Sequence, residues 1–558
     1  MSNQKDIIIF LYDKADVEEF NKLKITNINK IFIFSPGIEK FIHFKNNIEI
    51  IKIDIHQLVQ NQKKTIIVSQ NIYSKFKKNI KELENLRRGL REDIYSVFFI
   101  SLFSFLYIHY NSIDSKNYAL IYNNQVQHFN DKKIFLSFFI EKIINKKNQG
   151  FFLFLKKKKI SFFKKTLICL NNFFLKKGPP SLLVYGKKLS LKISSDKERR
   201  ILEVIRHSDF NLYHIFLNII NILKIFNKKK HYYFTCYPAE KINIKEIEYL
   251  INNIFKDLLD NNFLYLEKHF KEIIVNYCIQ QYKSRKSYYN FLSRINIIKF
   301  YTDQLRYDIP TIIADISKEI DFETFLVPHG SMSTPSDEYA SFVNKISGRG
   351  MIFSPLADKI YAQTKISAHA ISFHEHSKKI IRSQPLLYGE KKIKIRKIKS
   401  SSDNFNFLHV SSPKSLSKWP WIYEDFNEYV YNLKNLINYF SNQNKHKLTI
   451  RFREGPECEL ETFKKIINVE NKYINFSKNK CFIDELLVND VLISYSSTAI
   501  EESLIYNKPI IIYSDYKNYK HINYKFKKNK IIYSNQNSIK NDIRNINISE
   551  TIDYKINW

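Results

Sequence analysis

The first 130 residues alternate between two spacings of apolar side chains. Continuous apolar runs, typical of buried strands, lie in 6–12, 30–35 and 48–55, and helical spacing lies in 16–24. Strand, helix and strand at these distances predict parallel βαβ units in an open α/β sheet. The runs KTIIVS, from residue 64, and NYALIYN, from residue 117, predict that further strands continue the pattern.

Two segments of the N-terminal half differ from this pattern. Residues 94–113 contain no Asp, Glu, Lys or Arg and are about long enough to span a membrane, but their Ser, His and Asn residues favour a buried core helix. Between 145 and 200, basic runs interleave with Phe-rich runs. That pattern fits a nucleic-acid or membrane-facing surface, or buried elements whose lysine ends reach water. Residues 198–226 and 246–282 predict mainly helices.

From residue 300 the alternation of helix and strand resumes. Helix 310–319 leads into strand 324–327, another strand and helix follow, and the polar connector 392–405 separates a second βαβ series that ends near 515. Length and pattern together predict two Rossmann-like domains in tandem. We expect the following division: a first domain at 1–380 with a basic, aromatic and helical insertion at about 145–300, a second at 381–515, and a basic tail at 516–558.

Composition adds a strongly basic balance. Lys and Arg total 89 against 55 Asp and Glu, a net charge of +34. This charge suits nucleic acid, an anionic membrane surface or phosphorylated substrates. Compositional drift toward Lys, Asn, Ile, Tyr and Phe, with Gly and Met scarce, explains it equally well. Five dispersed cysteines without CxxC spacing indicate reduced thiols, and the N-terminus lacks the pattern of a signal sequence, so we expect a cytoplasmic protein.

Tandem α/β domains usually bind ligands outside the carboxyl ends of their strands, so polar groups there are the candidates. His329 and Gly330 follow the strand TFLV, with the acids Asp337 and Glu338 shortly after. His can donate to a phosphate, and Gly lets a ligand approach the backbone. The alternative is an ordinary turn with a satisfied imidazole.

The second series offers three more candidate segments. HVSSPKS suits a phosphate-binding loop or an ordinary polar loop, and TIRFREG places two guanidiniums on one side of a strand, for a diphosphate or an ion-paired face. In SYSSTAIEESLIY, a capping box explains Thr498 and Glu501 but not the other hydroxyls, which suit an anion at a helix N-terminus. The candidate donor-binding residues are Ser411, Ser412, Lys414, Arg451, Arg453, Ser496, Ser497, Thr498, Glu501 and Glu502.

Familiar catalytic motifs do not occur: the chain has no GxGxxG, no GxxxxGK[ST], no HExxH and no GxSxG. His374 and His376 stand at spacing two on an expected helix, which points them apart, so we expect no metal site.

In their order, five segments resemble GT-B glycosyltransferases over about residues 305–515. They are PTIIADISKEIDFETFLVPHG, ADKIYAQTK, IIRSQPLLYG, TIRFRE and NDVLISYSSTAIEESLIYNKPIII. The nearest resemblance is to bacterial capsule and lipopolysaccharide transferases of the Kdo and sialic-acid type and to CDP-glycerol glycerophosphotransferases. It implies a GT-B fold, with two Rossmann-like domains facing a cleft. It also implies an inverting, metal-independent transfer of a sugar, such as a nonulosonic or Kdo-like acid, from a nucleotide donor to a surface-glycan or glycoconjugate acceptor.

The resemblance also implies roles for the candidate residues. His329 and the turn Ser496–Thr498 would hold the donor phosphate, Glu501 or Glu502 would meet the ribose or base, and the two arginines would add phosphate or carboxylate contacts. No cofactor is expected, and a CMP- or CDP-linked donor is favoured over a UDP-linked one. The general base belongs in the first domain, where Asp337, Glu338 and Asp13 are candidates, because the acidic pair before a Gly that sialyl-type transferases carry is missing.

Other functions remain open from the sequence. A CDP-glycerol-type polyol-phosphate transferase or a sugar-nucleotide epimerase fits the same fold, although epimerases normally have more glycine-rich loops. A basic nucleic-acid-binding protein is the alternative outside enzymes, and it predicts steeply salt-dependent binding to any DNA or RNA. A lipid-linked or acidic acceptor would place a transferase peripherally at the inner membrane face.

Overall fold

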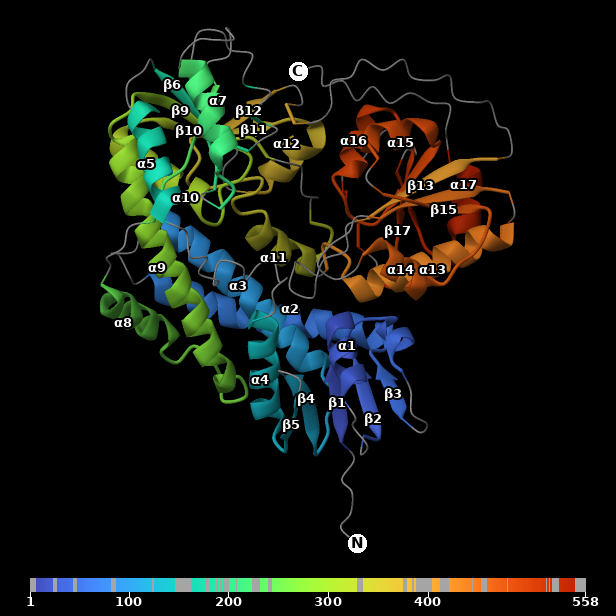
Figure 1. Ribbon diagram of the computed structural model, residues 1–558. Coiled ribbons are helices and arrows are strands. Elements are labelled where there is room, and N and C mark those ends of the chain that lie inside the picture. Colours follow the sequence, from blue (N-terminus) through green and yellow to red (C-terminus); the bar gives the residue numbers. More distant parts are fainter. Residues whose placement is uncertain are drawn as a thin grey trace.

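The described residues fold into three separate sheets, each accompanied by helices (Figure 1). The predicted α/β fold with parallel sheets is confirmed. The computed structural model describes residues 7–546 except 24–27, 44–47, 82–86, 123–124, 146–161, 176–179, 187–188, 191–192, 194–199, 207, 223–230, 239–242, 329–334, 375–378, 384–385, 388–403, 412–420, 444, 453–458, 479, 518, 521 and 524–530.

The first sheet has the strand order β3-β2-β1-β4-β5, and β5 runs antiparallel to β4. Four of its strands match the predicted apolar runs. The run KTIIVS is not a strand but part of the long helix α2, because its buried residues Thr65, Ile66 and Ser69 continue at helical spacing to Ile72 and Phe76. The elements of this region are β1 (Ile8–Leu11), α1 (Lys14–Lys22), β2 (Lys30–Ile33), η1 (Ile38–Phe41), β3 (Glu49–Lys52), α2 (Ile55–Lys81), α3 (Arg88–Asn111), β4 (Tyr118–Tyr122), β5 (Gln125–Phe129) and α4 (Lys132–Asn145).

The second sheet is parallel throughout, in the order β12-β11-β10-β9-β6-β7-β8. Its strands are β6 (Ser181–Tyr185), β7 (Arg200–Val204), β8 (His231–Phe234), β9 (Ile297–Thr302), β10 (Glu323–Leu326), β11 (Lys359–Ala362) and β12 (Ile380–Arg382). Its helices are α5 (Phe162–Leu175), α7 (Leu212–Ile222), α8 (Ile244–Phe255), η3 (Leu264–Leu266), α9 (Glu267–Leu292), α10 (Ile309–Ile320), α11 (Glu338–Ser347) and α12 (Lys365–Ser372).

This sheet changes the expected organisation of the N-terminal half. Residues 145–300 are not a helical insertion, since they supply β6, β7, β8 and β9. The stretch RILEV, expected to be helical, forms β7 because all five of its residues are buried, as both faces of a central parallel strand require. The first two sheets share one hydrophobic core that runs through α2 and α3. Residues 1–380 thus contain two sheets where we expected one.

The third sheet is also parallel, in the order β15-β14-β13-β16-β17-β18. The strand β18 belongs to the expected basic tail, so part of that tail completes this domain. Its elements are β13 (Asn406–Val410), α13 (Phe426–Gln443), β14 (Lys447–Arg451), α14 (Leu460–Ile467), β15 (Ile474–Ser477), α15 (Phe482–Val488), β16 (Val491–Ser494), α16 (Ala499–Ile505), β17 (Ile510–Tyr513), β18 (Ile531–Ser534) and α17 (Ile539–Asn545).

Helix α3 is the segment that the sequence left between a membrane span and a core helix. Among the described residues it is the one helix long and apolar enough to cross a membrane, yet 89% of its most apolar stretch is buried inside the fold. It packs against α2, α9 and α10 near the centre of the molecule (Figure 1). The prediction of a buried core helix is confirmed.

The second and third sheets turn their carboxyl ends toward each other. Trp421, in the connection after β13, donates from Nε1 to Asp337, in the connection after β10, at 3.0 Å. Thr364, after β11, donates to Glu501, after β16, at 3.0 Å. The backbone N–H of Lys520, after β17, donates to Ser336. Each contact joins a connection that leaves a carboxyl end in one sheet to its counterpart in the other.

Candidate functional site

The strand order of the third sheet locates its binding edge. Counted along the chain from β13, the order is 3-2-1-4-5-6, which is the Rossmann order. Ligands of such sheets bind outside the carboxyl ends where the order reverses, here between β13 and β16. Ser411 directly follows β13, and Ser496 and Ser497 follow β16. Two predicted hydroxyl-rich segments therefore leave the two strands that flank the reversal.

Glu424, just before α13, belongs to this edge and was not recognised from the sequence. Its side chain is buried, and its carboxyl oxygens accept hydrogen bonds from Ser411 Oγ at 2.6 Å and Asn432 Nδ2 at 2.7 Å. Burial raises the pKa of Glu424 to about 7, against the effect of these two hydrogen bonds. Ser411, predicted to contact the donor, therefore orients this carboxyl group in the structure.

A buried ion pair lies beside Glu424. Lys517, after β17, places its Nζ 2.8 Å from Glu428 on α13, and neither side chain is more than 2% exposed. Asp425 joins this group, because it accepts from Tyr107 of α3 at 2.6 Å and from Gln62 of α2 at 3.2 Å. The network ties the N-terminus of α13 to the helices of the first half of the chain. Local sequence contains no signal for it, since Gln62 and Asp425 are 363 positions apart.

The turn after β16 differs from its predicted capping arrangement. Thr498 is exposed and makes no side-chain cap hydrogen bond, whereas Ser497 Oγ accepts from the Ala499 N–H at 3.2 Å. Glu501 is buried and accepts from Thr364, the N-cap of α12, so it connects the two sheets. The predicted capping box of Thr498 and Glu501 is thus wrong.

The other residues of this turn have different surroundings. Ser496 is buried, and Glu502 is half-buried in the first turn of α16. The turn leaves β16 next to the reversal point, so its hydroxyls remain the predicted donor contacts. Glu501 reaches across to the second sheet through its hydrogen bond with Thr364.

Buried polar atoms without a hydrogen-bond partner gather at this edge of the sheet. Among the described residues they include His409 Nδ1 near the end of β13, Ser477 Oγ at the end of β15 and Ser494 Oγ at the end of β16. Burial lowers the pKa of His409 to about 4, so its ring is neutral at physiological pH. Native proteins rarely leave such atoms unmatched away from water, ions or ligands.

Arg451 is ion-paired rather than open to a phosphate. Its Nη1 lies 2.5 Å from Glu485 of α15 and donates to the Lys480 carbonyl at 2.8 Å. The competing reading of this strand, an ion-paired face, therefore holds for Arg451. Five further predicted site residues lie outside the described residues: His329, Gly330, Ser412, Lys414 and Arg453.

The acids expected to act as general base have structural partners or an exposed position. Asp337 is the N-cap of α11, accepts from the Ala340 N–H at 2.7 Å and also receives the Trp421 hydrogen bond. Asp13 caps α1 by accepting from the Asp16 N–H at 3.1 Å. Glu338 is exposed in the first turn of α11. Helix capping therefore accounts for Asp337 and Asp13.

The strand order of the second sheet also reverses, between β6 and β9. The sequence did not point to the residues at this reversal, Gly186 and Asp303. Gly186 follows β6 with a φ of +119°, and a Cβ at this position would lie 2.9 Å from the carboxylate of Asp303, which follows β9. Burial raises the pKa of Asp303 to about 6. Neither residue lies in a recognisable motif, and only the pairing of β6 with β9 brings them together.

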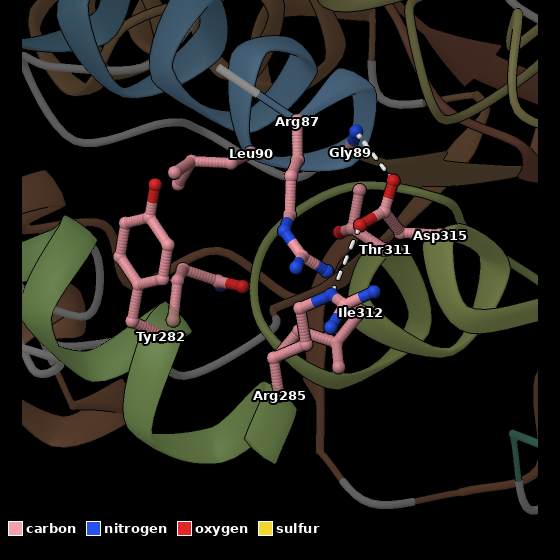
Figure 2. A pocket seen from close by; sticks show the side chains of 9 residues that line it. Arg87, Gly89, Leu90, Tyr282, Arg285, Thr311, Ile312 and Asp315 are labelled. Atoms are coloured by element: carbon pink, nitrogen blue, oxygen red, sulfur yellow. Dashed lines mark hydrogen bonds and ion pairs between the residues drawn. The ribbon is translucent and has the colours of Figure 1, made fainter. Parts of the chain in front are cut away.

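A small pocket lies between the helices α3, α9 and α10. It is lined by Arg87 and Gly89 at the start of α3, by Arg285 of α9 and by Asp315 of α10, among others (Figure 2). Arg285 lies 3.2 Å from Asp315 and 2.5 Å from Glu319. The pocket has a volume of about 20 Å³, enough for about one water molecule. The pocket is an ion-paired helix junction too small for a nucleotide.

No protein family model matches the chain, and no curated protein matches it. Among solved structures, Staphylococcus aureus MnaA with UDP is 12% identical, with 62% of this chain and 81% of that chain covered and a TM-score of 0.33. The lipopolysaccharide outer core galactosyltransferase WaaB is 11% identical, with 66% and 89% covered and a TM-score of 0.35. The Methanocaldococcus jannaschii UDP-GlcNAc 2-epimerase is 13% identical, with 65% and 91% covered and a TM-score of 0.35. The structural neighbours thus include glycosyltransferases and UDP-GlcNAc 2-epimerases.

Proposed function

We propose that this chain is an inverting, metal-independent glycosyltransferase that moves a sugar from a nucleotide donor to a surface-glycan or glycoconjugate acceptor. One observation carries the proposal: two parallel sheets of Rossmann order have their carboxyl edges in contact through Trp421–Asp337 and Thr364–Glu501. A group transfer needs a donor and an acceptor held next to each other. Two ligand-binding edges that face one another meet this requirement, whereas a single binding module needs one edge.

The donor nucleotide binds at the third sheet in this proposal, at the reversal between β13 and β16. Ser496 and Ser497 contact its phosphates. The predicted phosphate contacts Ser412, Lys414 and His329 lie outside the described residues and belong to the proposal by their place in the sequence. Hydrogen-bond donors fixed around the phosphate stabilise the negative charge that develops on the leaving nucleotide. A CMP- or CDP-linked donor remains our first choice, ahead of a UDP-linked one.

The donor site is tested by thermal unfolding with CMP, CDP, UDP and GDP. We expect one of these nucleotides to raise the unfolding temperature of the wild-type chain, because it binds the folded state only. Ser497→Ala should weaken that nucleotide about tenfold, as expected for one lost hydrogen bond to a charged group. Ser74→Ala, which removes an exposed hydroxyl on α2, serves as the control.

Two results would contradict the donor site. Unchanged nucleotide affinity in both Ser497→Ala and His329→Ala would remove the assigned residues. No stabilisation by any nucleotide, together with nanomolar, salt-dependent binding of random RNA, would replace the transferase with a nucleic-acid-binding protein.

We also propose that the enzyme contacts an anionic membrane surface through α5 and α7. These helices are adjacent, since Asn218 of α7 donates to Asn171 of α5 at 2.8 Å. Large apolar side chains along both helices are exposed to between 41% and 66%: Phe163, Leu170, Phe173, Leu212, Tyr213, Phe216, Ile219 and Ile222. Patches of this kind on a soluble protein mark interaction sites. The sequence places Lys156–Lys159 before α5 and Lys228–Lys230 after α7, which favours an anionic lipid surface over a neutral partner.

Vesicle flotation tests this membrane contact. We expect the wild-type chain to float with vesicles that contain phosphatidylglycerol. It should not float with vesicles of pure phosphatidylcholine, nor with either kind of vesicle at high salt. Replacing Phe163, Phe173, Leu212 and Phe216 with Ser should reduce the bound fraction at least tenfold, because the apolar contact area is lost. The control replaces Ile244 and Tyr249 of α8, which are also exposed. Equal flotation of both variants would contradict the assignment, as would concentration-dependent dimerisation that the first variant abolishes.

A further inference from the structure

The connection between β9 and α10, residues 303–308, lies at the carboxyl edge of the second sheet, and hydrogen bonds to residues outside it anchor its backbone at Leu305, Tyr307 and Asp308. The Leu305 N–H donates to the Gly350 carbonyl at 2.6 Å, and the Tyr307 N–H donates to Asp93 at 2.7 Å. The Asp308 N–H donates to the Tyr277 hydroxyl at 2.9 Å. Tyr307 and Asp308 have φ values of +57° and +62°, a conformation that non-glycine residues keep only where surrounding contacts hold it.

Asp303 is the first residue of this connection, so it lies at the carboxyl edge between β6 and β9, where the strand order of the second sheet reverses. Asp303 is half-buried, and its carboxylate lies so close to Gly186 that a Cβ there would come within 2.9 Å of it. Among the described residues, its charged or titratable neighbours include Arg306 on the same connection and Tyr185 at the end of β6. The helix that follows, α10, has Asp308 as its N-cap, so Asp303 does not cap it, in contrast to Asp337 and Asp13, which cap α11 and α1.

Arg306, three residues after Asp303, lies near the connection after β13 in the third sheet. Its Nε is buried and has no hydrogen-bond partner among the described residues. Burial raises the pKa of Tyr423, in the connection after β13, and the charge of Arg306 acts against that rise. Tyr423 immediately precedes Glu424 of the donor edge. The acid and the arginine of this connection therefore lie on the side of the second sheet that faces the third.

We propose that Asp303 is the general base of the transfer and that the acceptor binds at the reversal between β6 and β9. This inference rests on the proposed function. The acceptor hydroxyl oxygen forms a bond to the anomeric carbon of the donor sugar while the bond from that carbon to the phosphate oxygen breaks. The nucleotide leaves with the electron pair, and the proton of the hydroxyl passes to the Asp303 carboxylate. The carboxylate belongs to a connection whose backbone is anchored at Leu305, Tyr307 and Asp308, which helps to position a base for the hydroxyl in the transition state.

Asp303 also has a pKa suited to this role. Burial raises it to about 6, so the group is mostly ionised at neutral pH and still basic enough to accept a proton. The general base was expected in this half of the chain, but at other acids. In the structure, Asp337 and Asp13 cap helices and Glu338 is exposed.

Release of free nucleotide with water as the acceptor tests the inference without knowledge of the natural acceptor. The probe is the sugar nucleotide whose nucleotide stabilises the wild-type chain, chosen among CMP-, CDP-, UDP- and GDP-linked sugars. We expect Asp303→Asn to lower kcat by about 10²- to 10⁴-fold, the usual contribution of a general base, with an unchanged thermal shift by the nucleotide. Asp303→Ala should regain activity in sodium formate, because an added carboxylate can replace a base but cannot restore a structural contact.

The matched control is Glu323→Gln, an exposed acid at the amino end of β10 in the same sheet, which should keep wild-type release. Wild-type kcat in Asp303→Asn, or a loss in Asp303→Ala that formate does not relieve, overturns the inference while the donor site stands. If no nucleotide stabilises the wild-type chain and no sugar nucleotide is cleaved, the proposed function fails and this inference fails with it.

Discussion

Replacing Lys517 with Met is expected to lower the free energy of unfolding by about 3–5 kcal/mol, the usual effect of removing one partner of a buried ion pair. Lys517 Nζ lies 2.8 Å from Glu428, and the lysine side chain has no solvent exposure. Without it, the carboxyl groups of Glu424, Asp425 and Glu428 remain buried together. Denaturant unfolding followed by circular dichroism at pH 7 measures the loss.

The pH dependence of this effect separates a lost charge from lost packing. Burial raises the pKa of Glu428, and removing Lys517, which lowers it, should raise it further. The folded variant then binds more protons than the unfolded chain, so its stability should recover as the pH falls and Glu428 becomes neutral. Glu428→Gln in the Lys517→Met background should restore part of the stability at pH 7.

The control for Lys517 is Lys520→Met, an exposed lysine three positions later, which should change stability by less than about 0.5 kcal/mol. Equal denaturation midpoints for the two lysine variants would contradict the assigned role of the buried pair.

Asp93→Ala should be similarly destabilising and should also reduce turnover. Asp93 is fully buried on α3, and its carboxylate accepts from the Tyr307 N–H, from Thr311 Oγ1 at 3.0 Å and from the Tyr277 hydroxyl at 2.8 Å. Removing it leaves two buried donors and the partly buried Tyr307 N–H without this acceptor, at roughly 1–3 kcal/mol for each buried donor. The left-handed residues Tyr307 and Asp308 lose their anchor, so the connection that carries Asp303 should relax.

The measurements are denaturant midpoints and release of free nucleotide from the sugar nucleotide. Burial raises the pKa of Asp93 to about 8, against its three hydrogen bonds. Because this value lies above the ordinary value near 4, Asp93 makes wild-type stability fall as the pH rises from about 4 to about 8. Asp93→Asn keeps an acceptor for Tyr307 and should show a weaker pH dependence over that range. The control is Asp114→Asn, whose side chain is almost fully exposed. Wild-type midpoint and turnover in Asp93→Ala would contradict this role.

Several elements followed from local pattern alone. The apolar runs in 6–12 and 30–35 form β1 and β2, and α10 lies where helical spacing placed the helix 310–319. Parallel strands buried on both faces have continuous apolar runs, and helices show a period near 3.6, so element type is encoded within a few residues. Local pattern failed where the two signals overlap, as in KTIIVS of α2 and RILEV of β7.

The candidate site was predictable only in outline. The hydroxyl turn after β16 does leave the strand next to the reversal point, as its place in the βαβ series indicated. Thr498 and Glu501, however, do not form their capping box, because Glu501 meets Thr364 from the other sheet. Likewise Arg451 forms an ion pair with Glu485, and Asp337 accepts a hydrogen bond from Trp421. Each of these partners lies far away in sequence or on a different element.

By itself, the sequence determined that this protein alternates strands and helices into parallel α/β sheets, because the spacing of apolar residues is a local property of the chain. The tertiary structure alone decided that the described residues form three sheets, that two of them turn their carboxyl edges together, and that Asp303 lies against Gly186 at one of those edges. Those features depend on which strands pair and on contacts between residues more than a hundred positions apart, such as Ser181 with Ile297. Such contacts form because the apolar faces of all the elements must be buried together, a condition that applies to the whole chain at once.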